Sequence, residues 1–354
     1  MNSDQNIKEV LSYYPIPTSY PIPTRSVTIE PVKTGLIHNS YKIHSKNDKY
    51  FLQQINTDVF NGVAGLMNNI ALVTNTLSES YKNSPFETLQ ILRTNEGELY
   101  KQTDNEAWRI YLFKDHLFGY DTPTNREMVK EAGIAFARFV KSLSAVDPSL
   151  LSVTIPDFHS MEYRLFQLRE ASENRSSLLS GVRVLKDQID HYSQLLLPLE
   201  YAMKNGELPV RVTHNDSKFN NLLFDEDGKA RCVVDLDTVM PGIIHFDVGD
   251  CLRTLTPTTA EDESDLEKIE LRADYQGAFL EGYTGNASGW LTAEEFNYLP
   301  YAAPYMALIM GIRFLTDHLN GNVYYSIDYP EHNLVRAKNQ AEVTRQFLDR
   351  FPLS

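Results

Sequence analysis

The chain has 354 residues, 42% of them hydrophobic and 23% charged, which is typical of globular proteins and sufficient for two lobes with separate cores. A formal net charge of −14 argues against binding to nucleic acid or to an anionic membrane surface. The two cysteines, Cys232 and Cys251, lack metal-ligand spacing and suggest no disulfide framework. No stretch has the length of a membrane span and no apolar targeting segment begins the chain, so we expect a cytoplasmic protein.

Residues 1–26 contain a short proline-rich tandem repeat, in which Tyr14–Ser19 is followed by the similar Tyr20–Arg25. Alternate prolines favour an extended, polyproline-like backbone. We expect a strap that lies on the following lobe, or a loop. Docking to an SH3-like partner is the alternative interpretation.

Residues 27–113 are predicted to form a small β-rich lobe with one helix. The helix spans residues 63–80, and a turn at 95–98 separates the last two strands. The expected strands are Val27–Glu30, Tyr41–His44, Tyr50–Ile55, Gln90–Arg93 and Ala107–Phe113.

Residues 114–354 are predicted to form a larger, mainly helical lobe. Apolar residues recur at three- and four-residue spacing over 126–146, and similar patterns predict helices over 265–283 and 304–319. The fold class is therefore α+β and bilobal.

The larger lobe contains the pattern His-x-Asp-x-x-x-x-Asn, formed by His214, Asp216 and Asn221. Two predicted strands, 221–224 and 230–234, follow it around a hairpin turn, and Asp235 ends the second strand. This is the catalytic-loop pattern of protein-kinase-like phosphotransferases.

The chemistry of phosphoryl transfer explains the spacing of this pattern. Asp216 is expected to face the acceptor hydroxyl, while Asn221 and Asp235 supply oxygen ligands to magnesium beside the phosphates. Asn and Asp also cap ordinary turns, but turn capping alone does not account for the whole pattern.

Together with residues 240–242 and 247–250, the motif resembles the aminoglycoside-phosphotransferase superfamily, and most closely the N-acetylhexosamine 1-kinases. The closer resemblance is carried by Tyr50–Asn56, Arg211–Asp216, Val234–Gly242, Gly311–Leu315 and Tyr329–Arg336. It implies a protein-kinase-like fold, with a small antiparallel-β lobe and a larger helical lobe. It also implies ATP and Mg²⁺ as cofactors and a sugar as the small-molecule substrate.

On the nucleotide side, the expected contacts are Gly35, Asn39, Ser40, Gln53, Phe113 and Asp115. The first three lie where a kinase keeps its phosphate-covering loop. Gln53 occupies the position of the usual phosphate-binding lysine, as in the hexosamine kinases, and the partner glutamate on the helix is also missing. Another cation, or magnesium, then has to neutralise the phosphate charge.

On the acceptor side, the resemblance implies that Arg313 contacts the sugar, with a structural ion pair on a helix as the alternative. Tyr324 is a candidate for stacking on the sugar, with core or surface packing as the alternative. Asp216 would orient an anomeric hydroxyl and accept its proton late. We therefore expect an N-acetylhexosamine 1-kinase. The alternatives are a kinase of choline, an aminoglycoside or another small acceptor, and a non-catalytic nucleotide-binding module.

Overall fold

The computed structural model describes residues 3–16, 27–32, 37–45, 48–60, 62–103, 106–173, 180–287, 289–351 and 353. They form two compact units, each built from three stretches of chain. Unit 1 comprises Met1–Gly119, Ala145–Ile155 and Leu222–Met240. Unit 2 comprises Tyr120–Ser144, Pro156–Asn221 and Pro241–Ser354.

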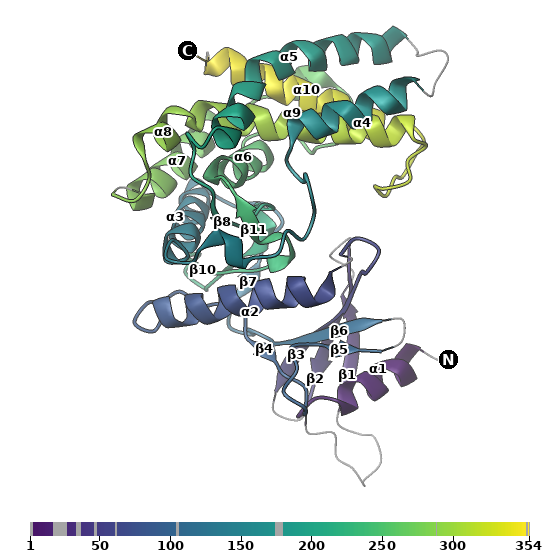
Figure 1. The fold of residues 1–354 in the computed structure, drawn as a ribbon, viewed down its shortest axis with the longest axis vertical. Coiled ribbons are helices and arrows are strands. Elements are labelled where there is room, and N and C mark those ends of the chain that lie inside the picture. The colour runs from purple at the N-terminus through teal and green to yellow at the C-terminus, as the bar shows by residue number, and fades with distance from the viewer. Residues whose placement is uncertain are drawn as a thin grey trace. The chain divides into compact units, whose positions relative to one another are not determined.

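Unit 1 is built around an antiparallel sheet in the order β1-β2-β3-β6-β4, with β5 also paired to β6 (Figure 1). Side chains alternate across the sheet, so Trp108 and Ile110 of β6 face one hydrophobic core while Arg109 lies on the opposite face. The strands are β1 (Thr28–Val32), β2 (Asn39–His44), β3 (Lys49–Ile55), β4 (Ile91–Leu92), β5 (Lys101–Gln102) and β6 (Ala107–Leu112).

Helix α1 (Ser3–Ser12) covers the core face of this sheet, where Ile7, Val10 and Leu11 are buried. Tyr14, just after the helix, donates a hydrogen bond from its hydroxyl to the Trp108 carbonyl at 2.8 Å. Residues 3–12 therefore form an amphipathic helix, which was not predicted from the sequence. Most of the Tyr-Pro-Ile-Pro-Thr repeat, residues 17–26, lies outside the described residues.

Unit 1 also contains α2 (Val63–Ser80), as predicted, and a second sheet with strand order β10-β9-β7. Asn69 of α2 donates to the carbonyls of Ser152 and Val239, so its amide ties the helix to two other stretches of the same unit. The remaining elements of the unit are β7 (Phe118–Gly119), η1 (Pro148–Leu150), β9 (Leu222–Phe224), β10 (Ala230–Val233) and η3 (Leu236–Thr238).

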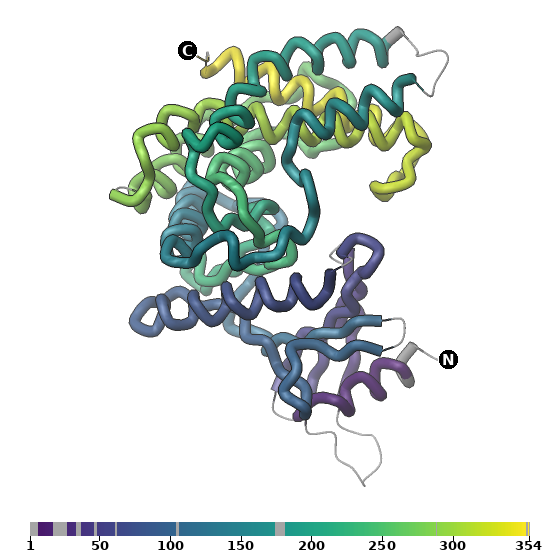
Figure 2. Tube along the Cα trace, viewed as in Figure 1, coloured from purple at the N-terminus to yellow at the C-terminus, as the bar shows by residue number. Residues whose placement is uncertain are grey.

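Unit 2 is mainly helical, and α9 and α10 run side by side in it (Figures 1 and 2). Helices α3 and α7 approach closely because they meet at glycines: a Cβ on Gly133 would lie 2.2 Å from the Phe279 carbonyl oxygen. The elements are α3 (Arg126–Ser142), α4 (Met161–Glu173), α5 (Ser180–Lys204), β8 (Arg211–Thr213), η2 (Phe219–Asn221), α6 (Ile244–Leu255), η4 (Leu266–Lys268), α7 (Ala273–Ala287), α8 (Ala293–Asn297), α9 (Leu299–Leu319) and α10 (His332–Arg350). The short strand β11 (Met240–Gly242) carries the chain from unit 1 into unit 2.

The predicted helix over 265–283 was wrong in its first half. Only the turn η4 and, after a break, α7 are helical, because residue 271 instead forms an isolated antiparallel bridge with Pro257. Arg272 fixes the break by donating its backbone N–H to the Thr256 carbonyl at 2.8 Å.

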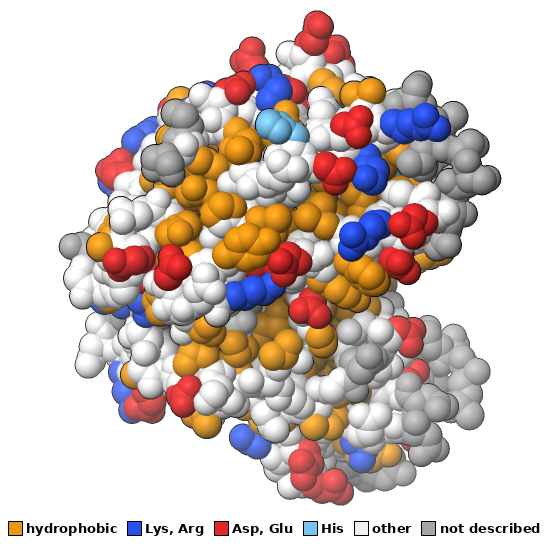
Figure 3. All heavy atoms as spheres, turned by 45° about the horizontal axis from the view of Figure 1, so that its top comes forward, with side chains coloured by type: hydrophobic (Ala, Val, Ile, Leu, Met, Phe, Trp, Pro, Cys, Tyr) orange, Lys and Arg blue, Asp and Glu red, His pale blue; other side chains and the backbone are white. Residues whose placement is uncertain are grey.

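The surface is mixed in charge. On the face drawn in Figure 3, the described Lys and Arg side chains alternate with Asp and Glu and form no continuous basic area. Among the described residues, no helix combines the length and apolarity needed to cross a membrane.

Candidate active site

Asp247, in the first turn of α6, anchors the catalytic loop, residues 214–221. The Asp247 carboxylate accepts the backbone N–H groups of His214 at 2.9 Å and Asn215 at 2.7 Å, and its carbonyl accepts the Ser217 hydroxyl at 2.6 Å. These contacts hold Asn215 in a left-handed conformation (φ 63°), which reverses the chain immediately before Asp216. Burial raises the pKa of Asp247 to about 6, against the lowering effect of His214.

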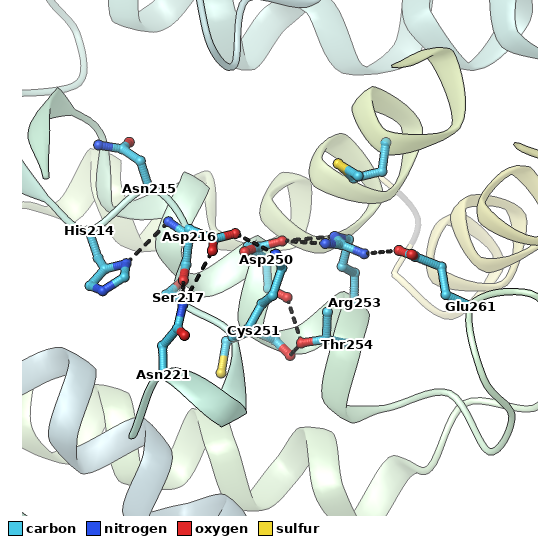
Figure 4. A network of polar contacts seen from close by, with 12 residues as sticks. His214, Asn215, Asp216, Ser217, Asn221, Asp250, Cys251, Arg253, Thr254 and Glu261 are labelled. Carbon is cyan, nitrogen blue, oxygen red and sulfur yellow. Dashed lines mark hydrogen bonds and ion pairs between the residues drawn. The ribbon is translucent and has the colours of Figure 1, made fainter. Parts of the chain in front are cut away.

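Asp216 presents its carboxylate from this reversal, beside Asn221 (Figure 4). Lys218 also contacts this carboxylate. The Asn221 amide nitrogen donates to the Asp216 carbonyl at 2.7 Å and to its carboxylate at 3.2 Å. The Lys218 ammonium lies 2.7 Å from the other carboxylate oxygen, and 25% of the Asp216 side chain stays exposed. The carboxylate is therefore held in one orientation and remains accessible to a ligand.

The charge state of Asp216 is set by two opposing effects. Burial alone would raise its pKa, but Lys218 outweighs burial and holds the pKa below its usual value. Asp216 is consequently ionised at neutral pH and acts as a hydrogen-bond acceptor. Lys218 was not among the predicted site residues, although it lies only two residues after the aspartate.

His214 connects the loop to the neighbouring helix α3. Its ring packs edge-on against Phe136 and Phe139 of α3, with ring centroids 5.9 and 5.8 Å away. Its Nδ1 accepts the backbone N–H of Asp216 at 3.3 Å. The imidazole thus connects the core of unit 2 to the loop backbone.

Two charged residues of α6, Asp250 and Arg253, act electrostatically on the loop. Arg253 donates to Asp250 at 2.8 Å and to Glu261 at 2.7 Å, and the Arg253 and Asp250 side chains are both buried (Figure 4). Asp250 also stabilises the ammonium of Lys218, whose pKa lies above its usual value despite burial. The negative charge of Asp250 therefore acts on Lys218 together with that of Asp216.

In unit 1, Gln53 occupies the position of the usual phosphate-binding lysine. Its side chain belongs to a buried polar network. Gln53 donates to the Ser40 hydroxyl at 3.1 Å and accepts a hydrogen bond from Arg109 Nε at 3.0 Å. Arg109 stands opposite Gln53 on the neighbouring strand β6, and its two terminal nitrogens both bind Asp237. The cation of this site is therefore an arginine on β6, which the sequence analysis did not identify.

His38 completes this network. Its Nδ1 accepts the backbone N–H of Asn56 at 3.0 Å, so the proton lies on Nε2, which is 2.9 Å from the Asp237 carboxylate. Burial alone would raise the pKa of Asp237, but Arg109 and His38 together hold it well below its usual range. Asp237 thus receives three hydrogen bonds and stays ionised.

The other residues predicted on the nucleotide side lie nearby in unit 1, apart from Gly35, which is outside the described residues. Asn39 donates its amide to Gln54 at 2.8 Å, and Asp115 pairs with Lys49 at 3.0 Å on the exposed surface. Phe113 donates its backbone N–H to the Lys49 carbonyl at 3.0 Å. Its ring lies under the Lys42 ammonium, 5.1 Å from the ring centre.

The two predicted metal ligands belong to different units: Asn221 ends a stretch of unit 2, and Asp235 lies in unit 1. Asp235 has a left-handed backbone (φ 59°) at the start of η3, two residues before Asp237. The Asn221 amide nitrogen is engaged by Asp216, which leaves its amide oxygen to face a cation. Carboxylate and amide oxygens are the ligand types that Mg²⁺ prefers, so both residues suit that ion.

On the acceptor side, unit 2 brings Arg313 of α9 and Tyr324 together. The Arg313 guanidinium lies 5.1 Å from the Phe158 ring centre, 5.5 Å from that of Tyr325 and 5.8 Å from that of Tyr324. Buried Asp317 anchors the tyrosines, because its carboxylate accepts the backbone N–H groups of residues 323, 324 and 325 at 2.9–3.0 Å. Tyr324 itself is 57% exposed.

Comparison with known proteins gives a family for this arrangement. Residues 28–287 match the profile of the phosphotransferase enzyme family, which is well over half of the chain. The chain belongs to that family. The broad prediction from the sequence, a kinase-like phosphotransferase of small molecules, is confirmed at this level.

Solved structures share the fold of this phosphotransferase at low sequence identity. A microcompartment-associated aminopropanol kinase is 12% identical, with 99% of both chains covered and a TM-score of 0.68. A choline kinase from Cryptosporidium parvum Iowa II is 13% identical, with 98% of this chain and 97% of that chain covered and a TM-score of 0.63. Spectinomycin phosphotransferase in complex with ADP and spectinomycin is 14% identical, with 97% and 98% covered and a TM-score of 0.59. The predicted α+β, protein-kinase-like fold is thereby confirmed.

Proposed function

We propose that this phosphotransferase is an ATP- and magnesium-dependent kinase that phosphorylates the anomeric hydroxyl of an N-acetylhexosamine. The observation that carries the proposal is the catalytic loop, in which an ionised, accessible Asp216 is held by Lys218 and Asn221. A carboxylate in this state accepts the hydrogen bond of an acceptor hydroxyl and orients its oxygen for attack.

The two units have separate roles in this proposal. In unit 1, residues 39, 40 and 53 lie toward the nucleotide, and Asp235 provides a metal ligand. In unit 2, Asn221 provides the second metal ligand, and Asp216 holds the acceptor hydroxyl and takes its proton late in the transfer. The metal, when bound, neutralises charge on the phosphate oxygens.

The acceptor side supports a sugar over a cation. Choline and related acceptors need an aromatic cage that is open to their positive charge. Here the aromatic rings of Phe158, Tyr324 and Tyr325 already surround the guanidinium of Arg313. A second cation would be repelled there, whereas a neutral or negative acceptor gains a donor.

A non-catalytic nucleotide-binding role is disfavoured by the charge around the loop. Lys218, Asn221 and the backbone contacts of Asp247 all serve to orient one carboxylate that a mere nucleotide binder does not require. Such a precisely oriented acidic group suits proton management at an acceptor.

The decisive experiment measures ADP release with a panel of hexoses, N-acetylhexosamines, choline and an aminoglycoside. The expected result is turnover with an N-acetylhexosamine and formation of its 1-phosphate, identified by phosphorus NMR. Asp216→Asn keeps the shape of the side chain but removes its charge, and should lower turnover by about 10²–10⁴-fold while nucleotide binding persists. Turnover of choline alone, or full activity of Asp216→Asn, contradicts the proposal.

A further inference from the structure

Unit 2 contains two arginines, Arg164 of α4 and Arg313 of α9, that face no carboxylate among the described residues. Arg164 donates to the Gln167 side chain at 2.8 Å and to the Phe158 carbonyl at 2.9 Å, but its Nε is shielded from solvent and has no partner. Within the described parts of the chain, Arg313 contacts the Met310 sulfur, at 3.5 Å, and the aromatic rings named above. Both arginines are half-buried, and a charged side chain withdrawn from water normally meets a carboxylate, so this pair is unusual.

The two guanidinium groups act on each other. Burial and the positive charge of Arg313 together lower the pKa of Arg164 to about 10. No shift of this kind occurs for Arg253, whose carboxylate partners hold its pKa above the usual value. Both groups contact Phe158, which offers its carbonyl to Arg164 and its ring to Arg313, and no carboxylate among the described residues pairs with either arginine.

Two carboxylates near the arginine pair, Asp317 and Glu261, already have other partners. Asp317 accepts four hydrogen bonds, three from backbone N–H groups and one from the Asn333 amide at 2.9 Å. Glu261, which acts on Tyr325, is bound by Arg253 at 2.7 Å. Neither carboxylate is left to neutralise the arginine pair.

The arginine pair adjoins the catalytic loop through residues 158 and 159. Phe158 offers its carbonyl to Arg164 and its ring to Arg313. The next residue, His159, bonds through Nε2 to the Asn215 carbonyl at 2.8 Å, immediately before Asp216. Burial lowers the pKa of His159 to about 3, with both arginines contributing, so this connection carries no charge at neutral pH.

We propose that the acceptor of this kinase carries a carboxylate, which binds to Arg164 and Arg313 while the reacting hydroxyl meets Asp216. The chemical class is a hexuronic acid, in its N-acetylated form where the proposed function holds, rather than an uncharged sugar. A planar guanidinium matches the two oxygens of a carboxylate. The Arg313 guanidinium, whose hydrogen-bond partner among the described residues is the Met310 sulfur, has donors left for such a group, and Arg164 adds positive charge beside it. The inference rests on the proposed function and narrows its substrate class.

The test compares matched pairs of sugars that differ only in the C6 group: N-acetylglucosamine with its uronate, glucose with glucuronate, and galactose with galacturonate. We expect kcat/KM for the uronate to exceed that for its neutral partner. Arg164→Met should reduce this uronate-to-neutral ratio by about 10- to 100-fold, the usual scale for a charge-assisted hydrogen bond. Arg164→Lys, which keeps the charge but loses the planar fork, should retain part of the preference.

Arg169→Met is the matched control, because Arg169 is an exposed arginine on the same helix α4 and lies against Phe166. It removes one positive charge from α4 and should leave the ratio unchanged. Calorimetry of uronate binding to the wild type and to Arg164→Lys provides a readout that does not depend on turnover or on the folding of the methionine variant.

The outcomes separate this inference from the proposed function. Preference for the neutral sugars, with the same ratio in wild type and Arg164→Met, overturns the carboxylate site and leaves the sugar kinase intact. Uronate binding that depends on Arg164, without phosphorylation of any sugar, supports the site and contradicts the proposed reaction. Absence of both uronate binding and uronate turnover overturns the inference.

Discussion

Replacing Arg109 with methionine should strongly destabilise unit 1. The Arg109 and Asp237 side chains are only 2% and 4% exposed, and the guanidinium gives Asp237 two of its three hydrogen bonds. Methionine fills the volume but leaves a buried carboxylate with His38 alone. Breaking a buried ion pair in this way costs about 3–5 kcal/mol of unfolding free energy.

Tryptophan fluorescence isolates the unit in which the loss occurs. The chain has two tryptophans, Trp108 beside the substituted position in unit 1 and Trp290 in unit 2. In a Trp290→Phe background, urea denaturation followed by fluorescence reports the buried Trp108 and therefore unit 1. Observing one unit avoids treating the whole chain as a single two-state system.

Two comparisons decide the outcome. Arg93→Met removes an exposed arginine of the same unit, which donates to the Gly97 carbonyl, and should cost about 0.5 kcal/mol or less. Arg109→Met with Asp237→Leu removes both charges and should recover much of the loss, since the unpaired carboxylate is gone. A cost for Arg109→Met no larger than that for Arg93→Met would refute the role assigned to the pair.

Three further substitutions test the site itself. Lys218→Met removes the ammonium that lowers the pKa of Asp216, while the burial that raises this pKa remains. The acidic limb of the kcat/KM profile should therefore move to higher pH. A limb that does not move counts against the ion pair. Asp235→Ala should abolish magnesium-dependent ATP binding in calorimetry, because alanine offers the metal no oxygen ligand; unchanged affinity in magnesium excludes Asp235 as a ligand. Gln53→Lys should leave turnover unchanged or lower it, because an ammonium would replace the amide oxygen that now accepts a hydrogen bond from Arg109. A large rise in turnover contradicts this account.

Local patterns in the sequence were sufficient to predict much of the fold. The helix over residues 63–80 was predicted at its observed bounds, and the strands of unit 1 were placed to within a few residues, because periodicity and turn residues are encoded locally. The failures had tertiary causes. The helix α1 gains its stability by burying Ile7, Val10 and Leu11 on the sheet, and the helix expected from residue 265 is interrupted by a bridge between Pro257 and residue 271.

For the site, the sequence identified the residues whose spacing is fixed within one loop. Asp216 and Asn221 are five residues apart, and their contact follows from that short separation. Arg109 and Asp237 are 128 residues apart, and no local pattern pairs them. The available signal was an arginine within the otherwise apolar strand 107–112, since a charge in a buried strand requires a partner.

The Arg109 network also bears on how phosphate charge is handled. Arg109 supplies one positive charge and Asp237 one negative charge, while His38 is neutral because its Nδ1 accepts a backbone hydrogen bond. The network therefore adds almost no net positive charge near Gln53, unlike a lysine that offers its charge to the phosphates. The remaining neutralisation falls to the metal, so the role of Asp235 becomes correspondingly larger in our proposal. What the network provides instead is rigidity: it joins β3, β6 and the segment after β10 within unit 1, and so fixes the backbone from which Asp235 projects.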